Sequence, residues 1–293
     1  MAINNPLVSV CIPSYNNPDG LKKTLQNITA EQSYKNLEII ISDDASPDPT
    51  VWDVIQSFSV NDKRIRTFRQ KTNLGAEPNY QFVFENANGE YFMFAQNDDQ
   101  WSNQFIEKLV DALEKNPNAP AAISNVRYIN TDSQVLSPIH TLENISIYNA
   151  IGNGEIGFVF MGMWRRDMYR KYMMQTPPGI IGADHIIAVH AMIGSGSKIP
   201  IVHSELYIKG YRDGCFELCF GWDKFYSFRT WSCLMKTLLY SPHIPMHRKF
   251  ILPLVGFTNL MRACAVTGAQ IVLKLPDNNL LKRALKKYFF GAN

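Results

Sequence analysis

Cysteine is scarce in this chain of 293 residues, and its spacing is unlike that of cysteine-based sites. The five cysteines are an odd number and include no Cys-x-x-Cys pair. A disulfide framework or a structural zinc site requires paired or closely grouped cysteines. We therefore expect free thiols and a reducing compartment.

Targeting signals and long apolar runs are lacking as well. The N-terminus, MAINNPLVSVCIP, has neither a basic segment nor a long apolar one, so we expect no signal peptide. The most apolar long window, residues 250–275, is interrupted by proline, arginine and two amide side chains. That interruption argues against a membrane span, and we expect a cytoplasmic protein.

The chain also has little net charge and no dinucleotide-binding fingerprint. Its net charge is +3, which is too small to indicate a nucleic-acid partner. Hydrophobic residues make up 46%, which is typical of a globular protein with a core. After the first apolar run the chain reads PSYNNPDG, without Gly-x-Gly-x-x-Gly, which argues against an ordinary NAD-binding domain.

The first half of the chain alternates short apolar runs with helical patterns. Strands are predicted over residues 7–13, 37–42, 64–69, 91–95 and 121–126, and helices over residues 19–32, from Pro49, over 78–87 and after Ser102. This order predicts an α/β fold with a mostly parallel sheet flanked by helices. In such sheets the ligand lies beyond the carboxyl ends of the strands.

Polar clusters follow three of the predicted strands. They are Ser14-Tyr15-Asn16, Asp43-Asp44 and Asp98-Asp99, the last within FMFAQNDDQW. Adjacent carboxylates repel each other, and Mn²⁺ or Mg²⁺ is the most economical group to hold them together. The alternatives are a solvated loop that caps the next helix for the last cluster, and ordinary turns for the first two.

The segment SVCIPSYNNPDGLKKTLQNITAEQSYKNLEIIISDDASPD resembles the start of a family 2 glycosyltransferase, which has the Rossmann-like GT-A fold. Asn73-Leu-Gly75 and Asn79 resemble the positions that precede the family's metal motif. NDDQW resembles the family's Asp-x-Asp motif with its trailing tryptophan. The resemblance covers about residues 6–215 and departs at Gln96, where the first aspartate of the motif would fall.

The resemblance implies a nucleotide-sugar donor and a site that binds it with a divalent cation. Asp99 would bind the cation, and Asp98 would contact the ribose or the cation's water. Tyr15 would stack on the base and Asp43 would accept a hydrogen bond from it. The implied nucleotide-binding residues are Pro13, Tyr15, Asn16, Asp43, Asp44, Asn73, Gly75, Asn79 and Asp98.

The general base implied by the resemblance is Asp184, within GIIGADHIIAVHAMIGSG. It would deprotonate the acceptor hydroxyl, and the transfer would invert the anomeric carbon. A carboxylate at a helix N-terminus is also a common cap, so that alternative stays open. Candidate acceptor residues are Trp164, Arg165 and Arg212. For Trp164 the alternative is core packing, and for Arg212 a surface position.

The chain after Cys215 does not carry the resemblance. We expect a glycosyltransferase domain over residues 1–215, with a nucleotide-binding half (1–126) and an acceptor half (127–215). A helical extension would follow over 216–293. Its end, LKLPDNNLLKRALKKYFFGAN, is typical of a basic amphipathic helix on an anionic membrane surface. The alternative is a helix docked on the catalytic domain with a solvated basic face.

The function expected from the sequence is glycosyl transfer in polysaccharide or envelope-glycan synthesis. The donor would be a nucleotide sugar and the acceptor a glycan or a lipid-linked molecule. Two alternatives stay open. One is a non-catalytic relative that binds nucleotides or glycans, which the Gln96 departure favours. The other is a nucleotidyltransferase, although PSYNNPDG is not the Gly-rich basic loop of that class.

Overall fold

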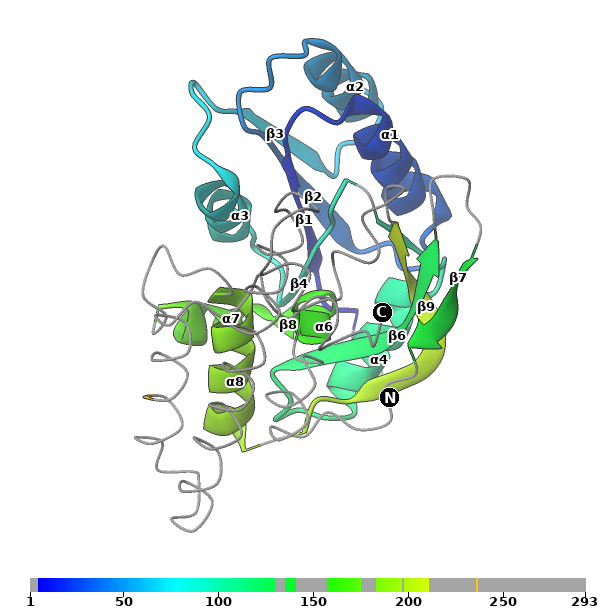
Figure 1. The fold of residues 1–293 in the computed structure, drawn as a ribbon, viewed down its shortest axis with the longest axis vertical. Helices are drawn as coiled ribbons and strands as arrows, with labels where there is room; N and C mark the ends of the chain where they lie inside the picture. The colour runs from blue at the N-terminus through cyan, green and yellow to red at the C-terminus, as the bar shows by residue number, and fades with distance from the viewer. Residues whose placement is uncertain are drawn as a thin grey trace, which may run out of the picture.

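A computed structural model describes residues 5–97, 99–129, 135–140, 157–174, 183–196 and 198–210, together with residue 236. The strands are β1 Val8–Ser14, β2 Leu37–Asp43, β3 Ile65–Arg69, β4 Tyr91–Phe94, β5 Gln100–Trp101, β6 Ala121–Ile129, β7 Val135–His140, β8 Met163–Arg165 and β9 Ile201–Gly210. The helices are α1 Pro18–Gln26, the π-helical turn η1 Asn27–Glu31, α2 Thr50–Ser59, α3 Ala76–Glu85, α4 Phe105–Glu114, α6 Gly157–Phe160, α7 Arg166–Met173 and α8 Ala183–Ser195. Figure 1 shows their arrangement.

The strands form one sheet with the order β3-β2-β1-β4-β8-β6-β9-β5, and β7 pairs with β6. Strands β1 to β4 are parallel, as the alternation of strands and helices predicts. The short strand β8 is antiparallel to both of its neighbours, β4 and β6. The mostly parallel sheet flanked by helices is therefore confirmed, with antiparallel strands added in the second half.

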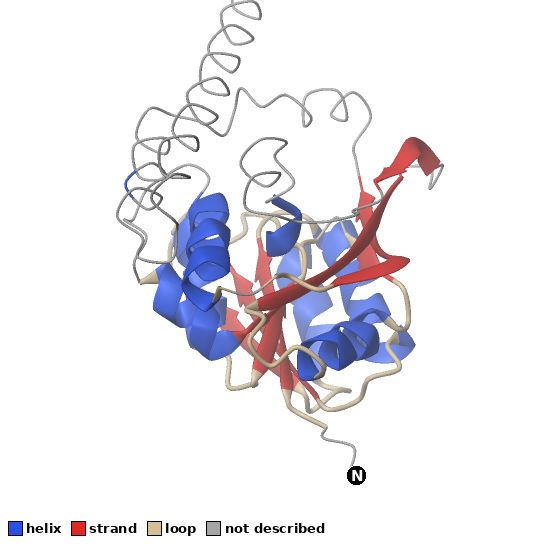
Figure 2. Cartoon of the chain, turned by 90° about the horizontal axis from the view of Figure 1, so that it is seen from below, coloured by secondary structure: helices blue, strands red, loops and turns tan. Residues whose placement is uncertain are grey.

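Both faces of the sheet are covered, and the side chains of β1 show how. Val8, Val10 and Ile12 pack with the apolar residues of α1, α2 and α4, whereas Cys11 packs with those of α3, α7 and α8. The period of two between these side chains is that of a strand buried on both faces. Figure 2 shows helices on both sides of the strands.

The expectation of free thiols is met at Cys11, which lies in the core and forms no disulfide. Burial raises the pKa of this thiol far above its ordinary value, so Cys11 is a packing residue without nucleophilic character. The other four cysteines lie outside the described residues. In the described part of the chain, no helix combines the length and the apolar character that a membrane span requires.

The first helix is shorter than predicted, because its last turn widens. It begins with Pro18 in the first turn, where Asn17 caps it by accepting a hydrogen bond from Gly20 N at 3.1 Å. After Gln26 the chain continues as the π-helical turn Asn27–Glu31. Such turns recur near functional sites, and this one places the buried Asn27 against Trp101 of β5.

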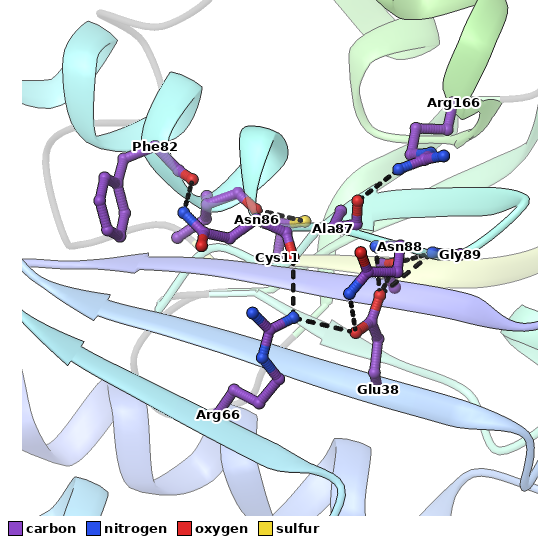
Figure 3. Close-up of polar contacts among 11 residues, drawn as sticks. Cys11, Glu38, Arg66, Phe82, Asn86, Ala87, Asn88, Gly89 and Arg166 are labelled. Atoms are coloured by element: carbon purple, nitrogen blue, oxygen red, sulfur yellow. Dashed lines mark hydrogen bonds and ion pairs between the residues drawn. The ribbon is translucent and has the colours of Figure 1, made fainter.

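Glu38, near the start of β2, organises the amino edge of the parallel strands (Figure 3). Its carboxylate accepts hydrogen bonds from Ser9 Oγ at 2.6 Å, Gly89 N at 3.1 Å and Asn88 Nδ2 at 3.2 Å. Arg66 adds an ion pair at 3.3 Å. Burial opposes ionisation, but these hydrogen bonds outweigh it and hold the pKa of Glu38 below its ordinary value. At this edge the Glu38 carboxylate therefore has hydrogen-bond and ion-pair partners within the protein, which indicates a structural role.

Candidate functional site at the carboxyl edge

The three polar clusters predicted from the sequence meet at the carboxyl edge of β1, β2 and β4. Asp44 N donates to Ser14 O at 2.9 Å, and Asn16 N donates to Ser46 Oγ at 2.9 Å, which joins the turns after β1 and β2. Asn97 Nδ2 donates to Ser14 Oγ at 3.0 Å, which joins the turn after β4. Parallel strands that end together bring these turns into contact.

Asp43 is the fully buried carboxylate at the centre of this edge. Its Oδ1 accepts a hydrogen bond from Ser46 N at 3.1 Å. Its Oδ2 has no hydrogen-bond donor among the residues that the structure describes, although Arg69 Nε lies 3.4 Å away as an ion pair. A buried carboxylate oxygen without a hydrogen bond is costly, so the site is suited to a ligand that brings an N–H group.

Arg69 is a site residue that the sequence analysis missed. It lies opposite Asp43 in the register of β2 and β3, and its guanidinium carbon is 5.4 Å from the ring centre of Trp52. The stacking holds the guanidinium beside Asp43 and leaves the arginine half exposed. The register of β2 and β3 reveals this pair, whereas the sequence shows only a basic residue at the end of a predicted strand.

Tyr15 is exposed to 48% at the end of β1, next to these buried groups. The following residue, Asn16, has a φ of 49°, in the left-handed region that asparagine tolerates better than most residues. Pro13, the third predicted residue of this turn, is partly buried within β1. The turn therefore presents an aromatic ring to the surface, where a nucleobase can stack on it.

Asp44 has a different role from its neighbour Asp43. Its two carboxylate oxygens accept hydrogen bonds from Leu74 N at 2.7 Å and Gly75 N at 3.0 Å. Asn73 Oδ1 accepts from Gly75 N at 2.8 Å, and Gly75 has a φ of 89° that favours glycine. Asp44, Asn73 and Gly75 thus form the support of a loop at the site, and their positions do not require direct contact with a nucleotide.

Two amide oxygens at this edge also lack hydrogen-bond donors. Asn79 Nδ2 donates to Ser42 O at 3.2 Å, but within the described ranges Asn79 Oδ1 has no hydrogen-bond partner. The same holds for the buried Oδ1 of Asn97. With Asp43 Oδ2, three buried acceptors are left at one edge of one sheet. Such a concentration of incomplete hydrogen bonds favours a ligand site over a purely structural edge.

Helix α1 supports the loop that carries Asp99. Thr24 Oγ1 donates to Gln96 O at 3.1 Å, and Gly20 packs so closely that a Cβ there would lie 2.0 Å from Asn97 O. Farther along, the Asn27 side chain pairs with the backbone of Trp101 through hydrogen bonds of 2.9 and 3.1 Å. The loop is therefore held by tertiary contacts.

Asp99 is buried and surrounded by hydrogen-bond donors from β9. Lys209 Nζ lies 3.0 Å from Asp99 Oδ2, and Tyr207 donates its hydroxyl hydrogen to the same oxygen. Gly210 N donates to Asp99 Oδ1 at 3.3 Å. Lys209 also donates to Gln96 Oε1 at 2.8 Å. Lys209 was not foreseen, because it is separated from Asp99 by 110 residues.

These contacts test whether the residues at this position fit a divalent cation. A hard cation needs carboxylate or carbonyl oxygens with free lone pairs. Both oxygens of Asp99 accept hydrogen bonds, and the Gln96 oxygen is taken by Lys209. No group of three potential metal-binding side chains occurs in the described segments, and Asp98 lies outside them. The described arrangement does not fit a cation while Lys209 stays in place.

The predicted catalytic residue lies where the sequence suggested, as far as the backbone is described. Asp184 is the second residue of α8, at the N-terminal end of that helix. Its side chain lies outside the described part of the chain, and so do Arg212 and the predicted extension 216–293. The roles of Asp184 and Arg212 stay predictions.

Two predicted acceptor residues lie in positions that do not suit that role. Trp164 is fully buried in the core, where its ring is 5.1 Å from that of Tyr169. Arg165 donates to Leu113 O at 2.7 Å and lies opposite Tyr91, the first residue of β4, at the amino edge. The structure favours the core-packing alternative for Trp164, and it gives Arg165 a structural role.

Comparison with known proteins identifies the family of this chain. Residues 9–174 match the family described as Glycosyl transferase family 2. The putative teichuronic acid biosynthesis glycosyltransferase TuaG of Bacillus subtilis is 32% identical over 153 residues, which are 52% of this chain and 60% of TuaG. An uncharacterized glycosyltransferase of Haemophilus influenzae is 32% identical over 39% of this chain and 45% of that protein. The chain thus spans less than two thirds of either relative.

Solved structures with a similar fold include TarS and a mannosyltransferase. TarS of S. aureus in complex with UDP has a TM-score of 0.69 at 14% identity, over 92% of this chain and 75% of that one. The mannosyltransferase PcManGT of Pyrobaculum calidifontis, in complex with GDP-Man and Mn²⁺, has a TM-score of 0.60 at 17% identity, over 99% of this chain and 81% of that one. At these identities the likeness shows the fold, and it agrees with the GT-A class predicted from the sequence.

Proposed function

The chain belongs to glycosyl transferase family 2, and from that premise we propose that it transfers a sugar from a nucleotide-sugar donor to an acceptor hydroxyl. The observation that carries the proposal is the buried Oδ2 of Asp43, which lacks a hydrogen bond within the described chain and lies at the same edge as the exposed Tyr15. A nucleobase would complete this site, because its N–H group supplies the missing donor and its ring stacks on tyrosine.

The rest of the donor would extend along the carboxyl edge toward the loop after β4. The hydrogen bond between Asn97 and Ser14 joins that loop to the turn that carries Tyr15. A base at Asp43 and a diphosphate near Lys209 and Asp99 would therefore occupy one continuous edge. Support comes from two neighbours in fold, TarS in complex with UDP-GlcNAc and PcManGT in complex with GDP-Man. These two donor types are the first candidates.

Asp184 is proposed as the general base. The acceptor hydroxyl gives its proton to the Asp184 carboxylate, and its oxygen forms a bond to the anomeric carbon. The bond from that carbon to the diphosphate breaks, and the electron pair leaves with the nucleoside diphosphate. Attack from the face opposite the leaving group inverts the anomeric carbon. The place of Asp184 at the start of α8 supports this role.

The divalent cation predicted from the sequence would neutralise charge on the departing diphosphate. The PcManGT complex contains Mn²⁺, and Asp99 and Asp98 are the carboxylates that the sequence predicts for such an ion in this chain. In this chain Lys209 already contacts Asp99, at 3.0 Å. We therefore assign the steps above to the chain's own residues.

We further propose a glycan or lipid-linked acceptor from the cell envelope, in line with the name of TuaG. The basic segment 273–293 would bring the protein to an anionic membrane surface. Co-sedimentation with phosphatidylglycerol vesicles tests the membrane contact. Equal recovery in the supernatant with and without vesicles would rule it out.

The donor site is tested by thermal stability with UDP, GDP, UDP-GlcNAc and GDP-Man. A ligand at about 100 times its dissociation constant adds roughly 2.7 kcal/mol of stability, which is a visible shift of the melting temperature. We expect a shift with one nucleotide family, and its loss in Asp43→Asn. Asp53→Asn on α2 is a matched control, because Asp53 is exposed. No shift with any of the four would contradict the proposal.

A non-catalytic binding relative is the second candidate, and the Gln96 departure favours it. The two functions differ in turnover. An enzyme releases nucleoside diphosphate from the bound donor, and Asp184→Asn slows that release without weakening donor binding. A binder shows the thermal shift but releases no product in either variant.

A further inference from the structure

The positively charged side chain of Lys209 binds to the loop after β4. Its ammonium group lies 3.0 Å from Asp99 Oδ2 and 2.8 Å from Gln96 Oε1. Asp99 has a fully buried side chain, and the Lys209 side chain is 13% exposed. Such burial of both partners distinguishes this ion pair from surface pairs, which are weak and changeable. The ion pair between Lys209 and Asp99 is therefore part of the packed structure at the carboxyl edge.

The position of the lysine is set by its strand. Lys209 lies in β9, where its partner in the register with β6 is Tyr128. Tyr207, two residues earlier, packs its ring 5.7 Å from Trp101 and gives its hydroxyl hydrogen to Asp99. Gly210 follows and donates its backbone N–H to the same carboxylate. Three residues of β9 therefore contact the Asp99 carboxylate: Tyr207, Lys209 and Gly210.

A divalent cation and the Lys209 ammonium group compete for the same oxygens. A cation bound to Asp99 Oδ2 would lie within contact distance of Nζ, and two positive charges that close repel strongly. The chain also has the neutral Gln96 where the resemblance expects an aspartate, so one negative charge is missing. The loss of a carboxylate and the gain of an ammonium group both weaken divalent-cation binding at this position.

We propose that Lys209 is the resident cation of the Asp99 site and takes the place of a divalent metal ion. Its positive charge would then meet the diphosphate of the donor, so that nucleoside diphosphates bind without added metal. The second statement rests on the proposed function, whereas the first concerns only Lys209 and Asp99. The two are therefore tested separately.

The first experiment measures Mn²⁺ alone, by the electron paramagnetic resonance signal of the free ion. We expect wild type, Lys209→Arg and the exposed control Lys108→Met to leave the signal unchanged. Lys209→Met removes the competing charge and should bind Mn²⁺ about tenfold tighter or more, the size expected for a charged hydrogen bond lost to a carboxylate. Equal Mn²⁺ affinity in wild type and Lys209→Met would overturn the proposal.

The second experiment measures UDP and GDP binding by calorimetry in EDTA and in Mn²⁺. The wild-type protein should bind either UDP or GDP, with the same affinity in EDTA as in Mn²⁺. Lys209→Met should lose roughly 10- to 100-fold of that affinity in EDTA and regain it with Mn²⁺. Loss of wild-type binding in EDTA would overturn the metal-free role. If wild type binds neither nucleotide in either buffer, the proposed function fails, and the Mn²⁺ experiment still decides the role of Lys209.

A double variant guards against misfolding of Lys209→Met, which leaves Asp99 buried without its ion pair. Gln96→Asp with Lys209→Met restores the carboxylate that the resemblance expects and removes the ammonium group. This variant should bind Mn²⁺ and require it for nucleotide binding. If it melts like the wild type but still binds the nucleotide in EDTA, Lys209 is not the cation that the diphosphate uses.

Discussion

The two edges of the parallel strands contain carboxylates in different surroundings: Glu38 is partly buried and Asp43 is fully buried. At the amino edge, Glu38 accepts hydrogen bonds from Ser9, Asn88 and Gly89. At the carboxyl edge, Asp43 Oδ2 has an ion pair but no hydrogen bond within the described residues. Since both edges belong to the same strands, the difference is not one of fold. Among the described residues, Glu38 at the amino edge has hydrogen-bond donors, whereas Asp43 at the carboxyl edge has an oxygen without one, which favours a ligand at that edge.

A glycine at each edge extends the comparison. A Cβ at Gly89 would lie 2.6 Å from Ser9 Oγ, and one at Gly20 would lie 2.0 Å from Asn97 O. Both positions allow no side chain, because polar groups approach the backbone closely. At the amino edge the neighbour is the Glu38 network, and at the carboxyl edge it is the loop that carries Asp99. Close packing against a glycine therefore supports the Glu38 network at Gly89, and it positions the loop that carries Asp99 at Gly20.

The largest expected effect is the loss of turnover when the proposed general base is replaced. Asp184→Asn removes the proposed general base, so we expect kcat to fall by about 10²–10⁴ with donor affinity unchanged. Product nucleoside diphosphate released in the presence of acceptor gives the rate. Asp53→Asn on α2 should keep the wild-type rate. A kcat within a few-fold of wild type in Asp184→Asn would contradict the assignment.

The next effect concerns donor affinity. Asp43→Asn removes the charged acceptor at the carboxyl edge and should weaken nucleotide binding by roughly 10- to 100-fold, the value of one hydrogen bond to a charged group. The melting temperature without ligand should change little, since Oδ2 makes no hydrogen bond within the described chain and its ion-pair partner, Arg69, is half exposed. Isothermal calorimetry and a thermal scan measure the two quantities. A large loss of stability with normal affinity would reverse the comparison of the two edges.

The glycine pair gives a matched test of intermediate size. Gly20→Ala and Gly89→Ala each force a methyl group against polar atoms, and each should lower the free energy of unfolding by about 1–3 kcal/mol. Only Gly20→Ala should also weaken nucleotide binding, because it displaces the loop held by α1. Urea unfolding and calorimetry on both variants check this. Equal nucleotide affinity in the two would mean that the α1 contact does not position the site.

The smallest effect is the pH dependence of stability at the amino edge. The pKa of Glu38 is lower in the folded protein than its ordinary value of 4.5, so its ionised form stabilises the fold. That stabilisation is complete above the ordinary value and is lost as the pH falls through the lowered one. Glu38→Gln should cost about 1 kcal/mol near neutral pH, with unchanged kcat.

Urea unfolding of wild type and Glu38→Gln near pH 7 and near pH 3 gives the corresponding measurement. The difference in unfolding free energy between the two proteins should shrink at the lower pH, because Glu38 is then becoming protonated in the wild type. A difference that grows as the pH falls would mean that burial, and not hydrogen bonding, controls this carboxyl group.

Much of the first half of the fold follows from local patterns. The apolar runs of β1 and β2 and the helical pattern of α4 are long enough to be recognised. The antiparallel strands β5 and β8 were not predicted, because they have only two and three residues. So short a strand is defined by its partners, and its sequence carries no period. Trp164 in β8 was proposed as an acceptor residue from the family resemblance, with core packing as the alternative, and it packs in the core.

The residues of the candidate site likewise include some that the sequence predicted and some that only the structure revealed. Tyr15, Asp43 and Asp99 were expected at one edge, since parallel strands end together. Arg69 and Lys209 were not expected, because only the register of β3 and the position of β9 bring them to Asp43 and Asp99. The sequence likewise did not separate Asp43 from Asp44, which supports the loop at Leu74 and Gly75.

The sequence by itself determined the alternation of strands and helices in the first half of the chain, the family and the polar turns that gather at the carboxyl edge. These features depend on the hydrophobic period and on motif spacing, which are local properties of a chain. The tertiary structure decided which carboxylate is left without a hydrogen bond and which one Lys209 neutralises. Those outcomes depend on distances of about 3 Å between residues far apart in sequence, which only packing sets.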